Sequence, residues 1–190
     1  MGGPNKLLAT FDGVPLIRRS VETALASRAA RVFVVLGHQG ERLRDALGPC
    51  DAELLDNPAY AEGLSSSLRL GFDAAAGHGD GALVMLADQP ALEPAHLDAL
   101  TEAFRPEGSG SIVVATGEGK RGNPVVLSSR FAAQVSAITG DRGARDLIRA
   151  NEALVREVEI GPAALLDVDT PDLLRAAGGV IAPDAVPRRS

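Results

Sequence analysis

The nine residues from Ala82 to Pro90, Ala-Leu-Val-Met-Leu-Ala-Asp-Gln-Pro, constrain the fold more than any other stretch of the chain. An apolar run without polar alternation is typical of a strand that is buried on both faces, as in a parallel sheet covered by helices. Pro90 ends such a strand just after Asp88. Open α/β sheets bind ligands beyond the carboxyl ends of their strands, so Asp88 is a candidate functional residue. Aspartate is also common in turns and at helix starts, and the run alone leaves that structural role open.

Strand-like and helix-like segments alternate along the rest of the chain. We expect further strands at 32–36, 53–55, 111–115, 123–127, 155–160 and 165–169, and helices at 16–26, 41–47, 68–76, 94–104, 131–138, 139–150 and 170–177. This order predicts an α/β fold with a mostly parallel sheet between two helix layers. Because the composition does not change along the chain, we expect one domain at 1–177 and a loosely ordered tail at 178–190.

Charge and composition exclude several classes of partner. A net charge of −6 disfavours nucleic acid, and an aromatic content of 3% leaves few side chains for base stacking. The sequence contains no run of about 18 apolar residues, so no membrane segment is predicted. One cysteine, Cys50, suits a reducing compartment, so a cytoplasmic protein is expected.

Two further stretches suggest phosphate and metal chemistry. Gly2 and Gly3 form a turn-like start before Lys6, and backbone N–H groups with a lysine suit phosphate oxygens, although many such termini are only frayed ends. Asp169 ends an apolar segment before a Thr-Pro helix start, as Asp88 ends the first run. If the two acids converge they can hold Mg²⁺, which would support displacement at an α-phosphate with pyrophosphate leaving. The alternative is that Asp169 only begins a helix.

Six ordered segments resemble the MobA-like nucleotidyltransferases, and among them the molybdenum cofactor cytidylyltransferases. They are MGGPNKLL at 1–8, NPAYAEGLSSSL at 57–68, ADQP at 87–90, RGNPVVL at 121–127, TGDRGARDLI at 139–148 and LLDVDTPDLL at 165–174. The resemblance implies a Rossmann-like three-layer sandwich. It also implies Mg²⁺-dependent transfer of CMP from CTP to molybdenum-bearing molybdopterin, with a molybdoenzyme or its insertion chaperone as a further partner.

The resemblance also implies roles for individual residues. Lys6 and Asp88 would be catalytic, and Asp88 and Asp169 would bind the metal. The nucleotide would contact Gly2, Gly3, Lys6, Ser65 and Asp88. The acceptor would contact Gly122, Asn123 and Arg142.

Two departures from the family pattern leave alternatives open. The family's first strand and half of its phosphate loop, of the form Leu-Ala-Ala-Gly-x-Ser-x-Arg, are missing ahead of Met1. That strand is central in the family, so its absence predicts exposed backbone groups and apolar helix faces. Ala87 and Asn123 replace a usual glycine and a frequent histidine. A guanylyl-transferring or other nucleotidyl-transferring relative, or a non-catalytic pterin- or nucleotide-binding module, therefore remains an alternative.

Overall fold

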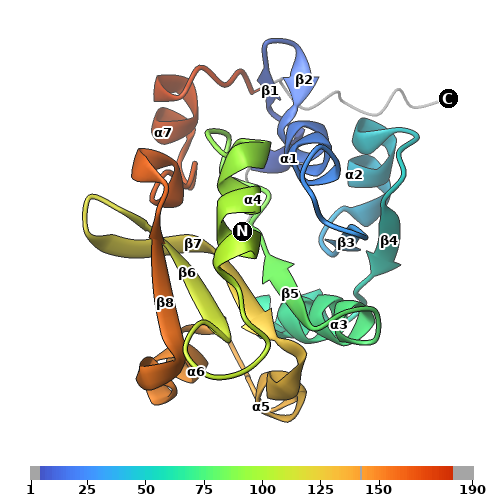
Figure 1. The fold of residues 1–190 in the computed structure, drawn as a ribbon. Helices are drawn as coiled ribbons and strands as arrows, with labels where there is room; N and C mark the ends of the chain where they lie inside the picture. Colours follow the sequence, from blue (N-terminus) through green and yellow to red (C-terminus); the bar gives the residue numbers. More distant parts are fainter. Residues whose placement is uncertain (1–4, 142, 182–190) are drawn as a thin grey trace, which may run out of the picture.

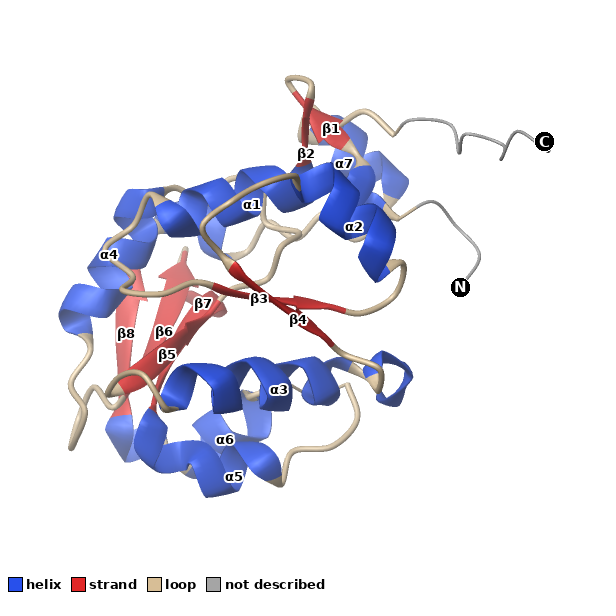
Figure 2. Ribbon diagram, turned by 90° about the vertical axis from the view of Figure 1, so that its right-hand side faces the viewer, coloured by secondary structure: helices blue, strands red, loops and turns tan. Residues whose placement is uncertain are grey.

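The strands lie between two layers of helices. The structure, a computed structural model, describes residues 5–141 and 143–181. One layer contains α1 (Leu16–Leu25), α2 (Gly40–Leu47) and α4 (Pro94–Ala103), and the other contains α3 (Leu64–Ala76), α5 (Ala132–Ser136) and α6 (Arg145–Ala150) (Figures 1 and 2). The predicted three-layer α/β architecture is therefore confirmed.

The strands form one four-stranded sheet and two smaller pairs. The large sheet has the order β5 (Gly81–Val84), β7 (Lys120–Ser128), β6 (Ile112–Gly117), β8 (Val155–Glu159). In it β7 runs antiparallel to both of its neighbours, whereas β6 and β8 are parallel. A parallel pair joins β3 (Phe33–Leu36) to β4 (Glu53–Asp56), and a hairpin joins β1 (Thr10–Phe11) to β2 (Val14–Pro15).

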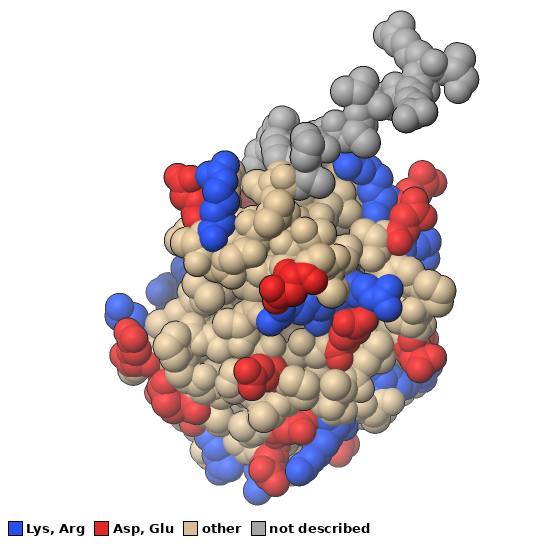
Figure 3. All heavy atoms as spheres, turned by 90° about the horizontal axis from the view of Figure 1, so that it is seen from above, with Lys and Arg blue, Asp and Glu red and all other residues tan. Residues whose placement is uncertain are grey.

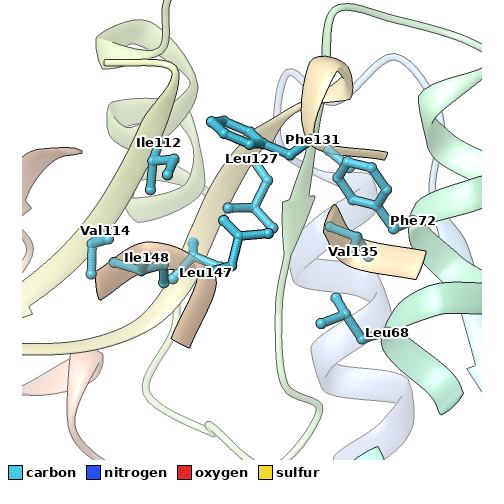
Figure 4. Close-up of a cluster of buried hydrophobic side chains, with 11 residues drawn as sticks. Leu68, Phe72, Ile112, Val114, Leu127, Phe131, Val135, Leu147 and Ile148 are labelled. Atoms are coloured by element: carbon cyan, nitrogen blue, oxygen red, sulfur yellow. The ribbon is translucent and has the colours of Figure 1, made fainter. Parts of the chain in front are cut away.

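The burial of each strand follows its sequence. All six residues of β6 are buried, as expected of an apolar strand with neighbours on both edges and helices on both faces. The edge strand β8, Val-Arg-Glu-Val-Glu, exposes its charged residues. On the α3 side, Leu68 and Phe72 of that helix belong to the same core cluster as Leu127 and Phe131 (Figure 4).

Short helical segments complete the chain. They are η1 (Lys6–Leu8), η2 (Tyr60–Glu62), η3 (Ser129–Phe131), η4 (Glu152–Leu154), η5 (Gly161–Ala164) and α7 (Pro171–Ala176). Beyond α7, Thr10 and Val180 exchange two backbone hydrogen bonds of 2.9 and 2.8 Å. Residues 182–190 of the expected tail lie outside the described residues, so the domain boundary at residue 177 stays a prediction.

Several expected elements differ from the structure, and α3 begins at Leu64 where a helix was expected from residue 68. The strand expected at 82–86 ends at Val84, where its ladder with β7 also ends at Val125. The strand expected at 165–169 is not formed, because its backbone bond to the segment after β5 is a single one, from the N–H of Val168 to the C=O of Asp88 at 3.0 Å. The helix expected at 139–150 is reduced to α6, which follows the positive-φ residues Gly140 and Gly143.

Charged side chains of both signs are mixed on one face of the molecule (Figure 3). Figure 3 shows basic and acidic side chains interspersed on the face seen from above, without a broad patch of either sign. Within the described ranges, every helix is too short or too polar to cross a membrane.

We expect Leu127→Ala to lower the free energy of unfolding by about 2–5 kcal/mol, because it empties a fully buried position in the large sheet. Leu173→Ala is the matched control, since Leu173 is 45% exposed, and its change should stay within about 0.5 kcal/mol. Urea denaturation followed by circular dichroism measures both. Equal losses in the two variants would contradict the assignment of the core.

Candidate functional site

One lysine side chain brings together three segments that lie far apart in the sequence. Lys6 Nζ donates to Asp88 Oδ2 at 2.5 Å and to Asp169 Oδ1 at 2.7 Å. The side chain of Asn5 begins η1 by accepting a hydrogen bond from the N–H of Leu7 at 3.1 Å, which fixes the turn that carries Lys6. The two strand-end acids of the sequence analysis therefore converge on one cation.

Backbone contacts position Asp88. The carbonyl of Ala87 accepts a 2.8 Å hydrogen bond from Ser20 Oγ of α1, and the carbonyl of Asp88 accepts one from Val168. The Asp88 side chain is 15% exposed, and its Oδ1 is buried without a hydrogen-bond partner. This oxygen retains acceptor capacity for a further cation or donor.

Asp169 is more accessible than Asp88. Its side chain is 67% exposed and directly precedes α7, where Thr170 Oγ1 accepts a 3.2 Å hydrogen bond from the N–H of Leu173. This N-cap is the predicted Thr-Pro helix start. Asp169 therefore lies just before a helix start and also faces the charged cluster. The two roles that its sequence position suggests are both present.

A third acid, Asp167, belongs to the same cluster. Burial, followed by the negative charges of Asp88 and Asp169, raises the pKa of Asp167 above its usual range. Its Oδ1 is buried without a hydrogen-bond partner. No functional role for Asp167 is predicted from the sequence, although residues two apart in an extended segment lie on one side, and that spacing relates Asp167 to Asp169.

The charge state of Lys6 is set by opposing effects. Burial lowers the pKa of Lys6, but hydrogen bonds and charge interactions with Asp169 and Asp88 outweigh it and raise the pKa overall. Lys6 is therefore fully protonated at neutral pH. It is available as a positive charge beside two carboxylates.

The cluster suits a hard divalent cation that shares its coordination with a substrate. Mg²⁺ and Mn²⁺ favour carboxylate oxygens, and Mg²⁺ commonly takes one or two from protein and the rest from water and phosphates. Asp88 and Asp169 already face one cation, and the unpartnered Oδ1 of Asp88 adds an acceptor. Over residues 5–141 and 143–181 no three or more His, Cys, Asp or Glu side chains are placed so that they could hold a metal ion by themselves. The donors therefore fit a cation bound jointly with phosphate.

The other predicted site residues are not all in this cluster. Ser65 is 1% exposed at the start of α3, and its Oγ accepts a 3.4 Å hydrogen bond from Arg69. Gly122 and Asn123 line a large cavity together with Asp167. Gly2, Gly3 and Arg142 lie outside the described residues.

Packing explains Gly122 and part of the serine run next to Ser65. A Cβ on Gly122 would lie 1.9 Å from the carbonyl oxygen of Ala164, so only glycine allows η5 to approach β7 here. In the segment before α3, buried Asn57 donates to Ser66 Oγ at 2.9 Å and to Ser67 Oγ at 3.0 Å. These two hydrogen bonds hold the turn after β4 against the start of α3. It explains part of the serine run without a ligand.

We expect Asp167→Asn to raise the free energy of unfolding at neutral pH by about 0.5–1 kcal/mol, because it removes a buried charge beside two like charges. The pKa of Asp167 is raised on folding, so its ionised form disfavours the folded state above that pKa. As the pH falls through that pKa, the advantage of the variant should disappear. Urea denaturation in a metal chelator at several pH values measures this, and a constant difference down to pH 3 would contradict it.

Comparisons with known proteins agree with the geometry. The model of the MobA-like NTP transferase domain matches residues 1–156. The purine catabolism protein PucB of Bacillus subtilis is 32% identical, over 92% of this chain and 90% of PucB. The nicotine blue oxidoreductase of Paenarthrobacter nicotinovorans is 28% identical, over 90% of this chain and 86% of its own.

The fold also matches a solved structure. Rv0371c from Mycobacterium tuberculosis, in a complex with manganese, superposes with a TM-score of 0.79 at 22% identity, over 91% of this chain and 90% of that one. The family match covers most of the chain, and its Rossmann-like fold agrees with the layers described above. The chain therefore belongs to the MobA-like NTP transferase family and is a nucleotidyltransferase of that family.

Proposed function

We propose that this chain transfers CMP from CTP to molybdenum-bearing molybdopterin in a Mg²⁺-dependent reaction that releases pyrophosphate. The convergence of Lys6, Asp88 and Asp169 carries the proposal, because it combines a phosphate-binding cation with oxygen ligands for a metal. Family membership supports a nucleoside triphosphate as donor. The six segments that resemble molybdenum cofactor cytidylyltransferases support cytosine and molybdopterin.

Lys6 acts on the triphosphate. An ammonium group has three N–H donors, and Asp88 and Asp169 accept two of them, so one donor remains for a phosphate oxygen. The raised pKa keeps this group charged throughout the neutral range. Its charge offsets the negative charge that grows on the departing pyrophosphate.

Asp88 and Asp169 would hold the divalent cation. When bound, the cation neutralises phosphate oxygens and stabilises the leaving group. In the reaction, a terminal phosphate oxygen of the acceptor forms a bond to the α-phosphorus of CTP as the bond from that phosphorus to the β-phosphate oxygen breaks. The acceptor oxygen is already ionised, so no side chain needs to remove a proton. Positioning and electrostatics supply the catalysis.

The acceptor would occupy the cavity that Asp167 lines. Gly122 and Asn123 line this part of the cavity, together with Arg145 and Arg149 near the α6 side. Guanidinium groups bind phosphate through paired donors, so they suit an anionic acceptor. The same cavity is thus lined by Asp167 of the acid cluster and by arginines of α6, with Asp141 and Asp146 beside them.

Asp88→Asn should lower kcat by at least about 100-fold, because it removes one charge from the cation site while preserving the size of the side chain. Asp172→Asn is the matched control, since Asp172 is 94% exposed and contacts Arg175 on the surface. Pyrophosphate release from CTP with molybdenum-bearing molybdopterin measures turnover, and circular dichroism verifies folding. Full activity of folded Asp88→Asn would exclude Asp88 as a cation ligand.

Nucleotide choice is tested by thermal unfolding with CTP, GTP or ATP, each with and without Mg²⁺. At about 100 times its dissociation constant a ligand adds roughly 2.7 kcal/mol of stability, so we expect a clear rise in Tm with CTP and Mg²⁺ together. A rise with GTP instead would favour a guanylyl-transferring enzyme. A rise without pyrophosphate release from any acceptor would favour a non-catalytic binding module.

A further inference from the structure

Two segments carry the acids of the cluster, and neither of them is part of a strand. Residues 85–89 follow the end of β5, and residues 165–169 form no ladder. The relative position of Asp88 and Asp169 therefore depends on single contacts between these segments. The hydrogen bond from the N–H of Val168 to the C=O of Asp88, at 3.0 Å, is one such contact.

The side chain of Gln89 provides a second contact between the same segments. Its Nε2 donates a long hydrogen bond of 3.4 Å to the carbonyl of Ala164. Gln89 is only 2% exposed, although glutamine side chains are mostly found on protein surfaces. Because Ala164 and Val168 lie at the two ends of one short segment, the two hydrogen bonds together hold residues 164–168 beside residues 88–89.

The same amide group also interacts with Asp167. Burial, followed by the charges of Asp88 and Asp169, raises the pKa of Asp167, and a hydrogen bond with Gln89 is among the effects that oppose this rise. Such a hydrogen bond stabilises the ionised carboxylate, because an amide N–H donates to it. The reverse orientation of the amide would place its oxygen against two other acceptors, so Nε2 is the atom that faces them.

The carbonyl of Ala164 is also held from the other side. A Cβ on Gly122 of β7 would lie 1.9 Å from this carbonyl oxygen, so η5 packs directly on the large sheet. Gln89 therefore joins the segment of Asp88 to a segment that is itself anchored on the sheet.

We propose that Gln89 is a positioning residue of the cation site. Its amide sets the separation of the Asp88 and Asp169 carboxylates by holding residues 164–167 in place. This inference rests on the proposed function, because it explains how the proposed cation site keeps its shape. Residues that orient metal ligands have a measurable effect of this kind, and their loss lowers metal affinity by roughly 10- to 100-fold.

Gln89 does not act by touching the substrate. Among the described residues, Ala87 and Asp167 line the cavity, but Gln89 is not one of its lining residues. A space-filling role would need no amide, because burying an amide is costly and an apolar side chain of the same length would fill the space equally well. The two roles therefore differ in what happens to the cation site when the amide is removed.

Gln89→Met tests the proposal, because it keeps the length of the side chain and removes both N–H donors. The probe is Mn²⁺ in saturating pyrophosphate, and binding is followed by the electron paramagnetic resonance of Mn²⁺. Mn²⁺ takes the same oxygen ligands as Mg²⁺, and pyrophosphate supplies phosphate oxygens without a nucleobase. We expect Gln89→Met to bind the probe at least about tenfold more weakly than the wild type. The amide of Val168 should exchange hydrogen at least about tenfold faster.

Two control variants separate this effect from a general loss of stability. Gln134→Met makes the same substitution on α5, where Gln134 is exposed and accepts a 3.1 Å hydrogen bond from Asn151. Leu127→Ala empties a buried position opposite Ala82, near the start of β5. Both controls should bind the probe as tightly as the wild type.

Gln89→Asn covers the case in which Gln89→Met does not fold. It keeps the N–H donors on a side chain that is too short to reach Ala164, so it should also weaken binding of the probe. Wild-type affinity in a folded Gln89 variant would overturn the role of Gln89 alone, and an equal loss of affinity in Leu127→Ala would do the same. If the wild type does not bind the probe, the cation site itself is wrong, and the metal dependence of the proposed function fails with it.

Discussion

The ammonium group of Lys6 determines how the charged end of this molecule is arranged. It joins residues separated by 82 and 163 positions, and without it the carboxylates of Asp88 and Asp169 would repel each other. The pair with Asp169 is largely exposed, so its contribution to stability is at most about 1 kcal/mol. The interaction therefore matters chiefly because it gathers the charges of the site.

The position of Asp88 depends on single contacts and not on a strand ladder. Between Val84 and Asp88 the chain has left β7, and it is held by Ser20 at Ala87 and by Val168 at Asp88. A segment that is held by only a few such contacts opens locally more readily than a central strand does. Residues 85–87 line the cavity and lead directly to Asp88, so their conformation affects where that carboxylate lies.

The sequence predicted the layered α/β fold and two acids that the structure brings together. Apolar runs identify buried segments well, as all six residues of β6 show. They do not identify hydrogen-bond partners. The segment 165–169 has a strand-like apolar pattern and is partly buried, yet it makes one backbone hydrogen bond to Asp88 instead of a ladder. The burial of Ser65 and the closeness of Gly122 to Ala164 likewise depend on tertiary contacts that local patterns do not contain.

The balance of charge at the cluster explains why a cation and a nucleotide would bind together. When Asp88, Asp167 and Asp169 are ionised, their three negative charges exceed the single positive charge of Lys6 by two. Burial, followed by this repulsion, raises the pKa of Asp167, and the repulsion would also oppose the approach of a triphosphate. A divalent cation offsets those two charges, so each ligand reduces the electrostatic cost of binding the other. Under the proposed function, the arrangement of these four side chains would make metal and nucleotide bind cooperatively.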